Sequence, residues 1–379
     1  MHSRKALLAC SILASLALCA CSSSPTSGAP ASDAAAPPAA SGSSAPANDY
    51  ELLNSLPADQ QVEKAIELAK KEGSVNVYGS ITPTVFDQLK KAFTSKYGIS
   101  VNDFRGSPET VLQRVTQELQ ANRAGADVVD ISDSQMADLA DEGGLMPHYS
   151  GPQLAKVDKA GVFEDWLADR FDLLLPAWNT DIIKPGDEPR SWTDLADPKY
   201  NGKMTIEGSD SEWFGALTIY WLKQGKSQSE IDQLWKDIAN GASISKGHTA
   251  MASLLSAGQQ GLEAMNYTYI IDLARAKGAP VDYRSADGIA HTPGFLLPFG
   301  LGAVKNAPHP AAAWLFINWM LSSPGGQDIF AASSVIPSTE VSGNKVLDGV
   351  TTIPFPVEEA HKNQKQYDTE FDALLRGVS

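Results

Sequence analysis

The sequence predicts an α/β fold with a mostly parallel sheet and helices on both of its faces. Two observations support this prediction. Short apolar strands alternate with helical segments from residue 74 to the helix start at residues 132–133, and a second pattern of the same kind begins near residue 203. Such alternation is typical of parallel sheets whose crossover helices cover both faces. No repeat of about 20 to 50 residues is visible, which disfavours a solenoid.

Each element of the first half has a local signal. Pro83 suits the first turn of a helix, and the four apolar residues from Val85 to Phe93 recur at helical spacing. Ser107-Pro108 and Ser132-Asp133 are typical helix starts, because Ser can cap a helix and Pro fits its first position. The three strands expected between these helices are Ser74 to Tyr78, Ile99 to Phe104 and Asp127 to Ile131.

The second half predicts a similar set of elements. The expected strands are residues 203–206, 242–245, 264–269 and 295–304, and the expected helices are residues 213–221, 310–321 and 325–332.

The overall charge excludes one class of partner. The 379 residues include 30 Lys and Arg against 45 Asp and Glu, so the formal charge is −15. A nucleic-acid partner is not expected, because no basic stripe is available to neutralise phosphates. Beyond the N-terminus no run of about 18 apolar residues occurs, so we expect a body that does not span a membrane.

The N-terminus predicts export and lipid attachment. Arg4 and Lys5 precede an apolar stretch, residues 6–20, which is typical of a secretory signal. The end of this stretch, Leu18-Cys19-Ala20-Cys21, resembles the lipobox of bacterial lipoproteins, and this resemblance implies cleavage before Cys21 and diacylation of that cysteine. An ordinary secretory peptide is the alternative. Residues 1–21 are therefore the expected signal, and the Ser-, Pro- and Ala-rich residues 22–48 a flexible tether.

Three loops that follow predicted strands are candidate ligand contacts, because open α/β sheets bind ligands beyond the carboxyl ends of their strands. Each loop leads into a helix N-terminus, where free N–H groups favour an anion. Helix capping alone is the alternative function of these side chains. The candidates from the first half are Ser80, Thr82, Arg105, Ser107 and Ser132.

The second half adds Asp210 and Ser211, in a polar loop, and a pair of tyrosines. Tyr267 and Tyr269 would lie on one face of the strand expected at 264–269, as paired phenol ligands or as ordinary aromatic packing. Glu212, next in the same loop, argues against an anionic ligand there unless it pairs with a cation or lies outside the cleft.

One segment connects the chain to a known family. Residues 192–203, WTDLADPKYNGK, resemble the W-x-D-L-x-D-P-x-Y-x-G-K segment of ABC-transporter substrate-binding proteins of the ferric-iron type. Residues 300–310, GLGAVKNAPHP, and the helix that follows extend the similarity, which spans roughly residues 70–340.

This resemblance implies a type II periplasmic-binding-protein fold, in which two α/β lobes are joined by two crossover strands around a ligand cleft. The implied first lobe is residues 49–178 and 291–379, and the implied second lobe is residues 179–290. It also implies a monomeric receptor without catalytic activity or a resident cofactor. The receptor would be anchored by lipid on the outer side of the cell membrane and would deliver its ligand to a permease and its ATPase.

The ligand stays open between two classes. In the ferric-binding relatives two adjacent tyrosines bind iron, usually with a His and a carboxylate from the first lobe or with a bound anion. Tyr267 and Tyr269 match the tyrosine position, although Thr268 separates them. The His position holds Ser80-Ile81, and the carboxylate position holds Ser132 with Asp133 beside it. Two phenols are too few for a trivalent ion, so iron would need a synergistic anion; a phosphate, phosphonate or carboxylate solute is the other candidate.

An α/β hydrolase exported as a lipoprotein is the rival class of function. The short pattern Ser243-Ile244-Ser245-Lys246 matches the S-x-x-K motif of penicillin-binding enzymes, but neither K-T-G nor S-D-N accompanies it. The six histidines show no zinc spacing. Two of them, His248 and His291, are candidates for positions near the cleft, with a surface or hinge role expected rather than ligation.

Overall fold

The computed structural model describes residues 48–377, so the predicted signal, Cys21 and nearly all of the predicted tether lie outside the described residues. Its helices are α1 (Asp49–Ser55), α2 (Ala58–Glu72), α3 (Pro83–Tyr97), α4 (Pro108–Gln120), α5 (Asp133–Asp141), α6 (Ser211–Lys223), α7 (Gln228–Gly241), α8 (His248–Ser256), α9 (Thr268–Ala276), α10 (Pro310–Met320), α11 (Gly326–Ala332) and α12 (Val357–Arg376). Its strands are β1 (Ser74–Gly79), β2 (Ser100–Arg105), β3 (Val128–Ser132), β4 (Leu167–Asn179), β5 (Met204–Glu207), β6 (Ala242–Ser245), β7 (Leu262–Tyr267), β8 (Val281–Asp282), β9 (Ala290–Ala303), β10 (Ile336–Pro337) and β11 (Val350–Pro354).

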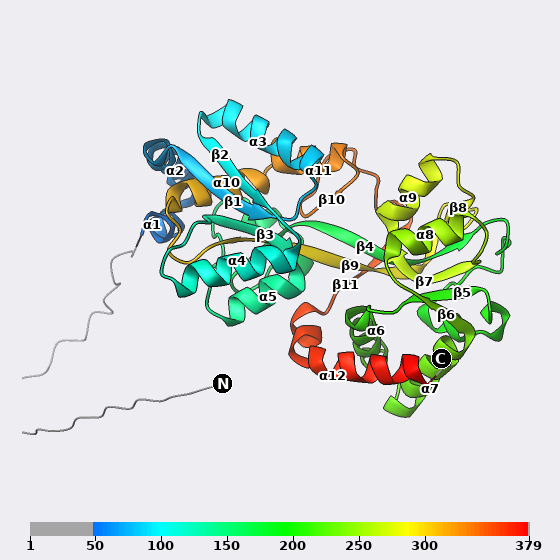
Figure 1. Ribbon diagram of the computed structural model, residues 1–379. Coiled ribbons are helices and arrows are strands. Elements are labelled where there is room, and N and C mark those ends of the chain that lie inside the picture. The colour runs from blue at the N-terminus through cyan, green and yellow to red at the C-terminus, as the bar shows by residue number, and fades with distance from the viewer. Residues whose placement is uncertain (1–47, 378–379) are drawn as a thin grey trace, which may run out of the picture. The chain divides into compact units, whose positions relative to one another are not determined.

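A single sheet runs through the described residues in the order β2-β1-β3-β9-β4-β7-β5-β6 (Figure 1). The two long central strands, β4 and β9, are antiparallel to each other. Strands β1 to β3 are parallel to one another, and so are β5 to β7. We call the part built on β1 to β3 the first lobe and the part built on β5 to β7 the second lobe; β4 and β9 pass through both.

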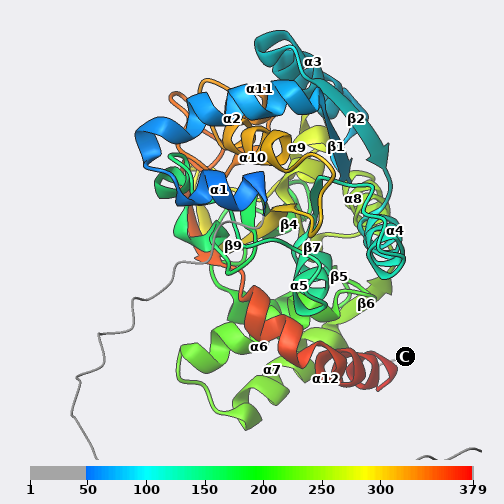
Figure 2. The same cartoon turned by 90° about the vertical axis from the view of Figure 1, so that its left-hand side faces the viewer.

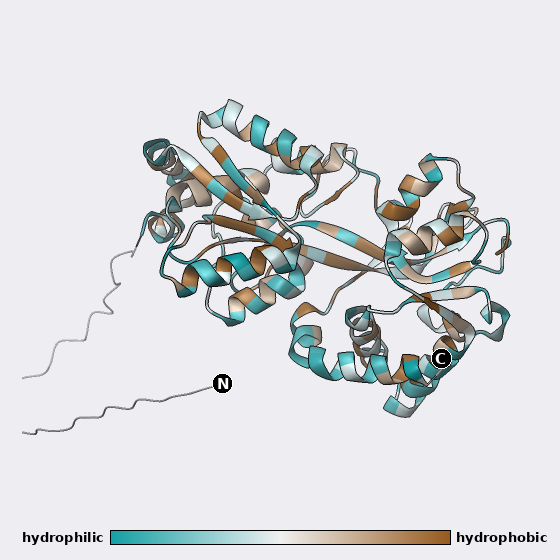
Figure 3. Ribbon diagram, in the orientation of Figure 1, coloured by the Kyte–Doolittle hydropathy of each residue, from teal (hydrophilic) through white to brown (hydrophobic). Residues whose placement is uncertain are grey.

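Alternation along the strands explains why both faces of the first lobe are covered. Val75 and Val77 of β1 pack in a core with α2, α3 and α10, whereas Val129 and Ile131 of β3 pack in another core with α4 and α5. Figure 2 shows α2 and α10 on one side of these strands and α4 and α5 on the other. In Figure 3 the inner strands are brown, and the outer faces of the helices are mainly teal.

The last helix differs from the expected division into lobes. Residues 291–379 were expected in the first lobe, but α12 packs against α6 of the second lobe, where Phe214 contacts the rings of Tyr367 and Phe371. The helix also reaches α5, because His361 Nε2 lies 3.1 Å from an Asp141 carboxylate oxygen. The chain therefore passes between the lobes a third time, after β4 and β9.

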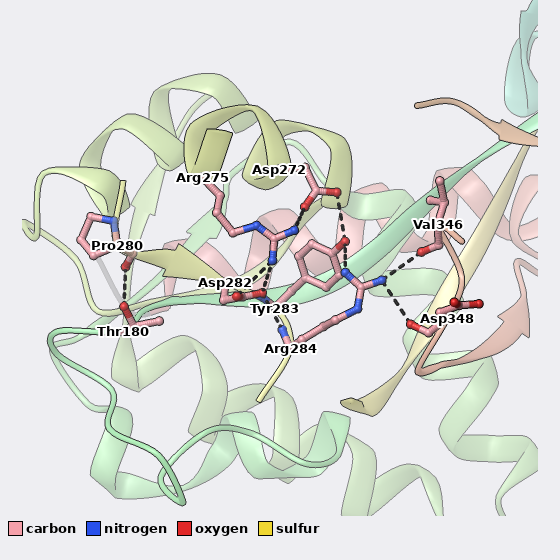
Figure 4. A network of polar contacts seen from close by, with 9 residues as sticks. All are labelled: Thr180, Asp272, Arg275, Pro280, Asp282, Tyr283, Arg284, Val346 and Asp348. Carbon is pink, nitrogen blue, oxygen red and sulfur yellow. Dashed lines mark hydrogen bonds and ion pairs between the residues drawn. The ribbon is translucent and has the colours of Figure 1, made fainter. Parts of the chain in front are cut away.

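A polar network holds this third passage against the second lobe (Figure 4). The Arg284 guanidinium donates to the Val346 carbonyl at 2.9 Å and stacks on the Tyr283 ring at 4.5 Å. The Tyr283 hydroxyl donates in turn to Asp272 of α9 at 3.0 Å. The segment before β11 is thus fixed to the second lobe by the charged groups of that lobe.

A buried ion cluster fixes the crossover strand β4 on the first lobe. Arg170 is 7% exposed; its guanidinium donates to both Asp130 carboxylate oxygens at 2.9 Å and to Asp169 at 2.9 Å. Burial alone would lower the pKa of Arg170, but the two carboxylates raise it above its usual value. The cluster ties β4 to β3, which ends at the site described below.

Removing this cation should destabilise the protein strongly. We expect Arg170→Met to lower the free energy of unfolding by about 3–5 kcal/mol, because it leaves two buried carboxylates without a counter-ion. Urea denaturation followed by circular dichroism measures this. Arg376→Ala is the matched control, because Arg376 also pairs with an aspartate but its side chain is 77% exposed; it should change stability by less than about 0.5 kcal/mol. Equal midpoints for the two variants would contradict the role given to Arg170.

Candidate functional site

The carboxyl ends of the two sets of parallel strands point toward each other along β4. Ser132, at the end of β3, and Arg170 of β4 both pair with Phe299 of β9. Tyr267, at the end of β7, pairs with Leu174 of β4. The two strand ends are therefore separated by four residues of β4, or about 13 Å. The loops that bind ligands in open α/β sheets meet across this short interval.

The two tyrosines lie together at the second-lobe side of this interval, although not for the reason expected. The expected strand at 264–269 is wrong at its end, because β7 stops at Tyr267 and α9 begins at Thr268. Tyr267 and Tyr269 therefore do not share a strand face. The turn into the helix still brings their ring centroids to 5.8 Å. Tyr267 is partly buried, whereas Tyr269 is 45% exposed.

Carboxyl groups surround Tyr267. Its pKa is raised well above the usual value, first by burial and then by the charges of Asp210, Asp172, Glu212 and Asp133. Burial and Asp172 also raise the pKa of Tyr269, to about 12. Both phenols are therefore neutral near neutral pH, and the region around them carries an excess of acidic groups.

The pKa values of these acidic groups are also raised by their surroundings. Burial raises the pKa of Asp172 to about 6, and burial together with the Asp210 charge raises that of Glu212 to about 7. Asp133, the first residue of α5, is 1% exposed and lies against Glu212 of α6; burial and this neighbour raise its pKa well above its usual value. A carboxyl pair of this kind holds a proton between the lobes.

Asp172 is a residue that the sequence analysis missed. It lies on β4 between Arg170 and Leu174, in the middle of the interval between the strand ends. Arg170 lowers its pKa, but that guanidinium is already bonded to Asp130 and Asp169. The available signal was one acidic residue inside the otherwise apolar stretch FDLLL.

His248 is the second missed residue. It begins α8, and its Nε2 lies 3.3 Å from an Asp210 carboxylate oxygen. Its ring packs edge-on against the Tyr267 ring at a centroid distance of 4.6 Å. Burial lowers its pKa, but Asp210, Glu207 and Glu263 raise it above the usual value overall. The expected surface or hinge position does not describe this environment.

The first-lobe candidates are arranged around helix starts. Thr82 and Ser107 precede α3 and α4, and both are exposed; Ser107 caps its helix by accepting from the Thr110 N–H. The exposed Arg105 donates to the Ile81 carbonyl at 3.0 Å. Ser132 donates to the Gln135 side chain. The Ser80 hydroxyl is buried and has no hydrogen-bond partner among the described residues.

The second-lobe loop faces in two directions. Asp210 points to His248, whereas the Ser211 hydroxyl donates to Asp368 of α12 at 2.6 Å. A cavity of about 1250 Å³ lies beside this loop; it is lined by Glu212, by α5 and α12 and by residues 163–166. Among residues 48–377 no group of three or more His, Cys, Asp and Glu side chains is placed to hold a metal ion. A metal would therefore need the tyrosines as well.

A serine, a histidine and an aspartate do align elsewhere, which bears on the hydrolase alternative. Ser74 Oγ lies 3.4 Å from His309 Nε2, and His309 Nδ1 lies 2.8 Å from Asp127. This set lies at the amino ends of β1 and β3, away from the tyrosines. Asp127 also accepts the backbone N–H groups of Asn76 and His309, so it joins α10 to the sheet. The Ser–His distance is long for a hydrogen bond, and structural capping accounts for the set.

The fold and the site together define a two-lobe solute-binding protein. Residues 78–327 match the family described as bacterial extracellular solute-binding protein, and the chain belongs to that family. It is thus a solute-binding receptor and not a member of an enzyme family. No helix of the described residues has the length and apolar character needed to cross a membrane.

The individual relatives described next share less than a quarter of their aligned residues with this chain. Iron uptake protein A1 of Synechocystis is 24% identical over 273 residues, covering 67% of this chain and 72% of the relative. The Trichodesmium protein IdiA (FutA), solved with iron and citrate, has a TM-score of 0.67 at 21% identity and covers 80% of this chain and 99% of its own. AfuA of Actinobacillus pleuropneumoniae, solved with fructose-6-phosphate, has a TM-score of 0.60 at 18% identity, with coverages of 80% and 99%. These neighbours confirm the predicted type II two-lobe fold.

The carboxyl pair between the lobes predicts a measurable pH dependence of the ligand-free protein. The pKa of Glu212 rises from 4.5 in the unfolded chain to about 7 in the folded protein. Ionisation of Glu212 therefore destabilises the fold; this destabilisation is absent below pH 4.5 and complete above about pH 7. We expect Glu212→Gln to be more stable than the parent at pH 8, by about 1–3 kcal/mol, and to lose this advantage toward pH 4.5. Urea denaturation at several pH values measures the difference.

Glu207→Gln is a control for which the opposite change in stability is expected. Burial raises its pKa, but hydrogen bonds from Gly247 and Ser209 outweigh burial and hold it below the usual value. Glu207→Gln should therefore lower stability at pH 8, and the loss should shrink in acid. Identical curves for Glu212→Gln and the parent at pH 5 and pH 8 would rule out the buried carboxyl pair.

Proposed function

We propose that this receptor captures ferric iron between its lobes, with Tyr267 and Tyr269 as the phenolate ligands. The single observation that carries the proposal is the pair of phenols, with rings 5.8 Å apart, placed where the charges of four acidic groups act on Tyr267. A trivalent cation favours anionic oxygen ligands. It would also relieve the repulsion among the carboxylates, which a second anion would increase.

The same charge distribution disfavours the anionic solute as the ligand. Asp133, Asp172, Asp210 and Glu212 all act on Tyr267, whereas the guanidinium of Arg105 donates to a backbone carbonyl. The relatives include one protein solved with iron and citrate and another solved with a sugar phosphate, so the fold alone does not choose between the two classes. The charges at the site favour the cation.

Iron binding by this site would proceed with loss of protons. Both phenols have raised pKa values, and each must lose its proton to become a ligand. Two phenolates leave several positions of a ferric ion unfilled, so further donors are required. We propose a synergistic anion for some of them, at the first-lobe loops that contain Ser80 and Ser132, because the buried Ser80 hydroxyl has no hydrogen-bond partner among the described residues.

The remaining steps follow from the family and from the N-terminal sequence. A two-lobe receptor closes over its ligand by hinge motion, and we propose that the closed form delivers iron to an ABC permease driven by its ATPase. We further propose that lipid on Cys21 holds the receptor, as a monomer, at the outer side of the cell membrane. Residues 22–48 would give it reach.

The iron proposal predicts a specific spectrum and its loss. Metal-free protein mixed with ferric citrate should develop a visible phenolate-to-iron charge-transfer band. Tyr267→Phe should weaken iron binding about a hundredfold or more, which corresponds to about 3 kcal/mol, and Tyr269→Phe should also weaken it. Citrate competition followed by the absorbance of this band measures both affinities.

Tyr220→Phe is the matched control, because Tyr220 contacts Phe295 and lies outside the site. It should leave the band and the affinity unchanged. Phosphate, phosphonates and small carboxylates without iron should leave the melting temperature unchanged, since none is the proposed ligand. A large stabilisation by one of these anions, with no effect of ferric citrate, would refute the proposal.

Lipid attachment predicts a labelled protein. Cells that express the full chain and are fed radioactive palmitate should incorporate label into it, and Cys21→Ser should abolish that label together with retention in the membrane fraction. Cys19→Ser should keep the label, because Leu18 precedes that cysteine where the lipobox has a small residue. Label that persists in Cys21→Ser would show that the lipid is attached elsewhere.

A further inference from the structure

The second lobe brings four different donor side chains to one place. Asp210 follows β5, His248 follows β6, and Tyr267 and Tyr269 lie at the end of β7 and the start of α9. Strand β5 lies between β7 and β6 in the sheet, so the three loops are neighbours. We propose that His248 and Asp210 bind the same ferric ion as the two tyrosines, so that the second lobe supplies the nitrogen and carboxylate ligands. This inference rests on the proposed iron-binding function.

The separations fit ligands of one ion. His248 Nε2 and the Asp210 carboxylate oxygen are 3.3 Å apart. Adjacent donors of a six-coordinate ion, each bonded at about 2.1 Å, lie about 3 Å from each other. The His248 and Tyr267 rings are in edge contact at a centroid distance of 4.6 Å, and the Tyr267 and Tyr269 ring centroids are 5.8 Å apart. The proposal requires that side-chain rotations direct all four donor groups at one point.

The local backbone holds this arrangement in place. Gly247 has φ 86°, a left-handed conformation that favours glycine, and its N–H donates to Glu207 at 2.8 Å. This turn sets the start of α8 and hence the position of His248. Asn266 donates to the His248 carbonyl at 3.1 Å, which ties the same residue to the end of β7. Hydrogen bonds thus connect the loop that bears His248 to the ends of β5 and β7.

Iron bound at Nε2 would leave the other ring nitrogen of His248 as it is, so the proposal depends on the surroundings of Nε2. Its Nδ1 is buried and has no hydrogen-bond partner among the described residues, and the same is true of one Glu263 oxygen, whose carboxylate charge acts on this ring. Buried polar atoms of a structural histidine are normally paired. Among the side chains of residues 48–377, only Asp210, the second proposed ligand, lies at hydrogen-bond distance from the ring, and it faces Nε2.

The position of the ligands determines whether iron binds before or after the lobes close. All four proposed protein ligands belong to the second lobe, so iron can be bound before the lobes close. Groups of the first lobe would then add ligands to an ion, or to its accompanying anion, that the second lobe already holds. In contrast, a site whose nitrogen ligand came from the first lobe would be complete only in the closed form.

Pulsed electron paramagnetic resonance tests the nitrogen ligand directly. The mature protein is loaded with ferric citrate, which contains no nitrogen, so a strong nitrogen coupling to the iron must come from the protein. We expect this coupling in the parent and expect it to change when the protein is labelled with ¹⁵N-histidine. The isotope experiment needs no substitution and so does not depend on the folding of a variant.

Substitutions identify the residues. His248→Ala should abolish the nitrogen coupling and weaken iron binding by at least about tenfold, whereas Asp210→Asn should keep the coupling and also weaken binding. His361→Ala is the matched control, because its Nε2 also lies 3.1 Å from an aspartate but on α12, outside the donor set. It should change neither the coupling nor the affinity.

The outcomes separate the two proposals. A parent protein that binds no iron refutes the proposed function and this inference together. A parent that shows the charge-transfer band without histidine nitrogen coupling keeps iron as the ligand and overturns the role of His248. A coupling that survives in His248→Ala also overturns it.

Discussion

Acidic groups are concentrated at the meeting point of the two lobes, and they determine which ligands can bind there. Asp133 comes from the first lobe, Asp172 from the crossover strand, and Asp210 and Glu212 from the second lobe, and all four charges act on Tyr267. Burial raises the pKa of each of these groups, so the ligand-free protein retains protons there. A cation that displaces those protons is attracted by the ionised carboxylates that remain.

The topology of the sheet brings groups from both lobes to this site. Strands β4 and β9 run antiparallel through both lobes, so the parallel strands on either side end facing each other. The ion cluster of Arg170 fixes one side of this interval, and the turn at Gly247 fixes the other. Helix α12 contacts both lobes beside the cavity, which adds a third connection to the two crossover strands.

The sequence predicted the elements whose signals are local. Pro83 and Ser107 marked the starts of α3 and α4, and the three first-lobe strands were placed to within about two residues. The tyrosine pair was found through its family position. Asp172 and His248 were missed because their importance depends on pairing between residues about 95 and 20 positions apart, which no local pattern encodes. The same reason hid the packing of α12 on α6, since an amphipathic helix does not specify which surface covers its apolar face.

Anomalous X-ray diffraction from crystals of the iron-loaded protein, collected at the iron absorption edge, locates the bound ion itself. We expect one strong peak within about 2.2 Å of the phenol oxygens of Tyr267 and Tyr269, on the second-lobe side of Asp172. A peak at any other place in the molecule, or an anion without metal between the lobes, would contradict it.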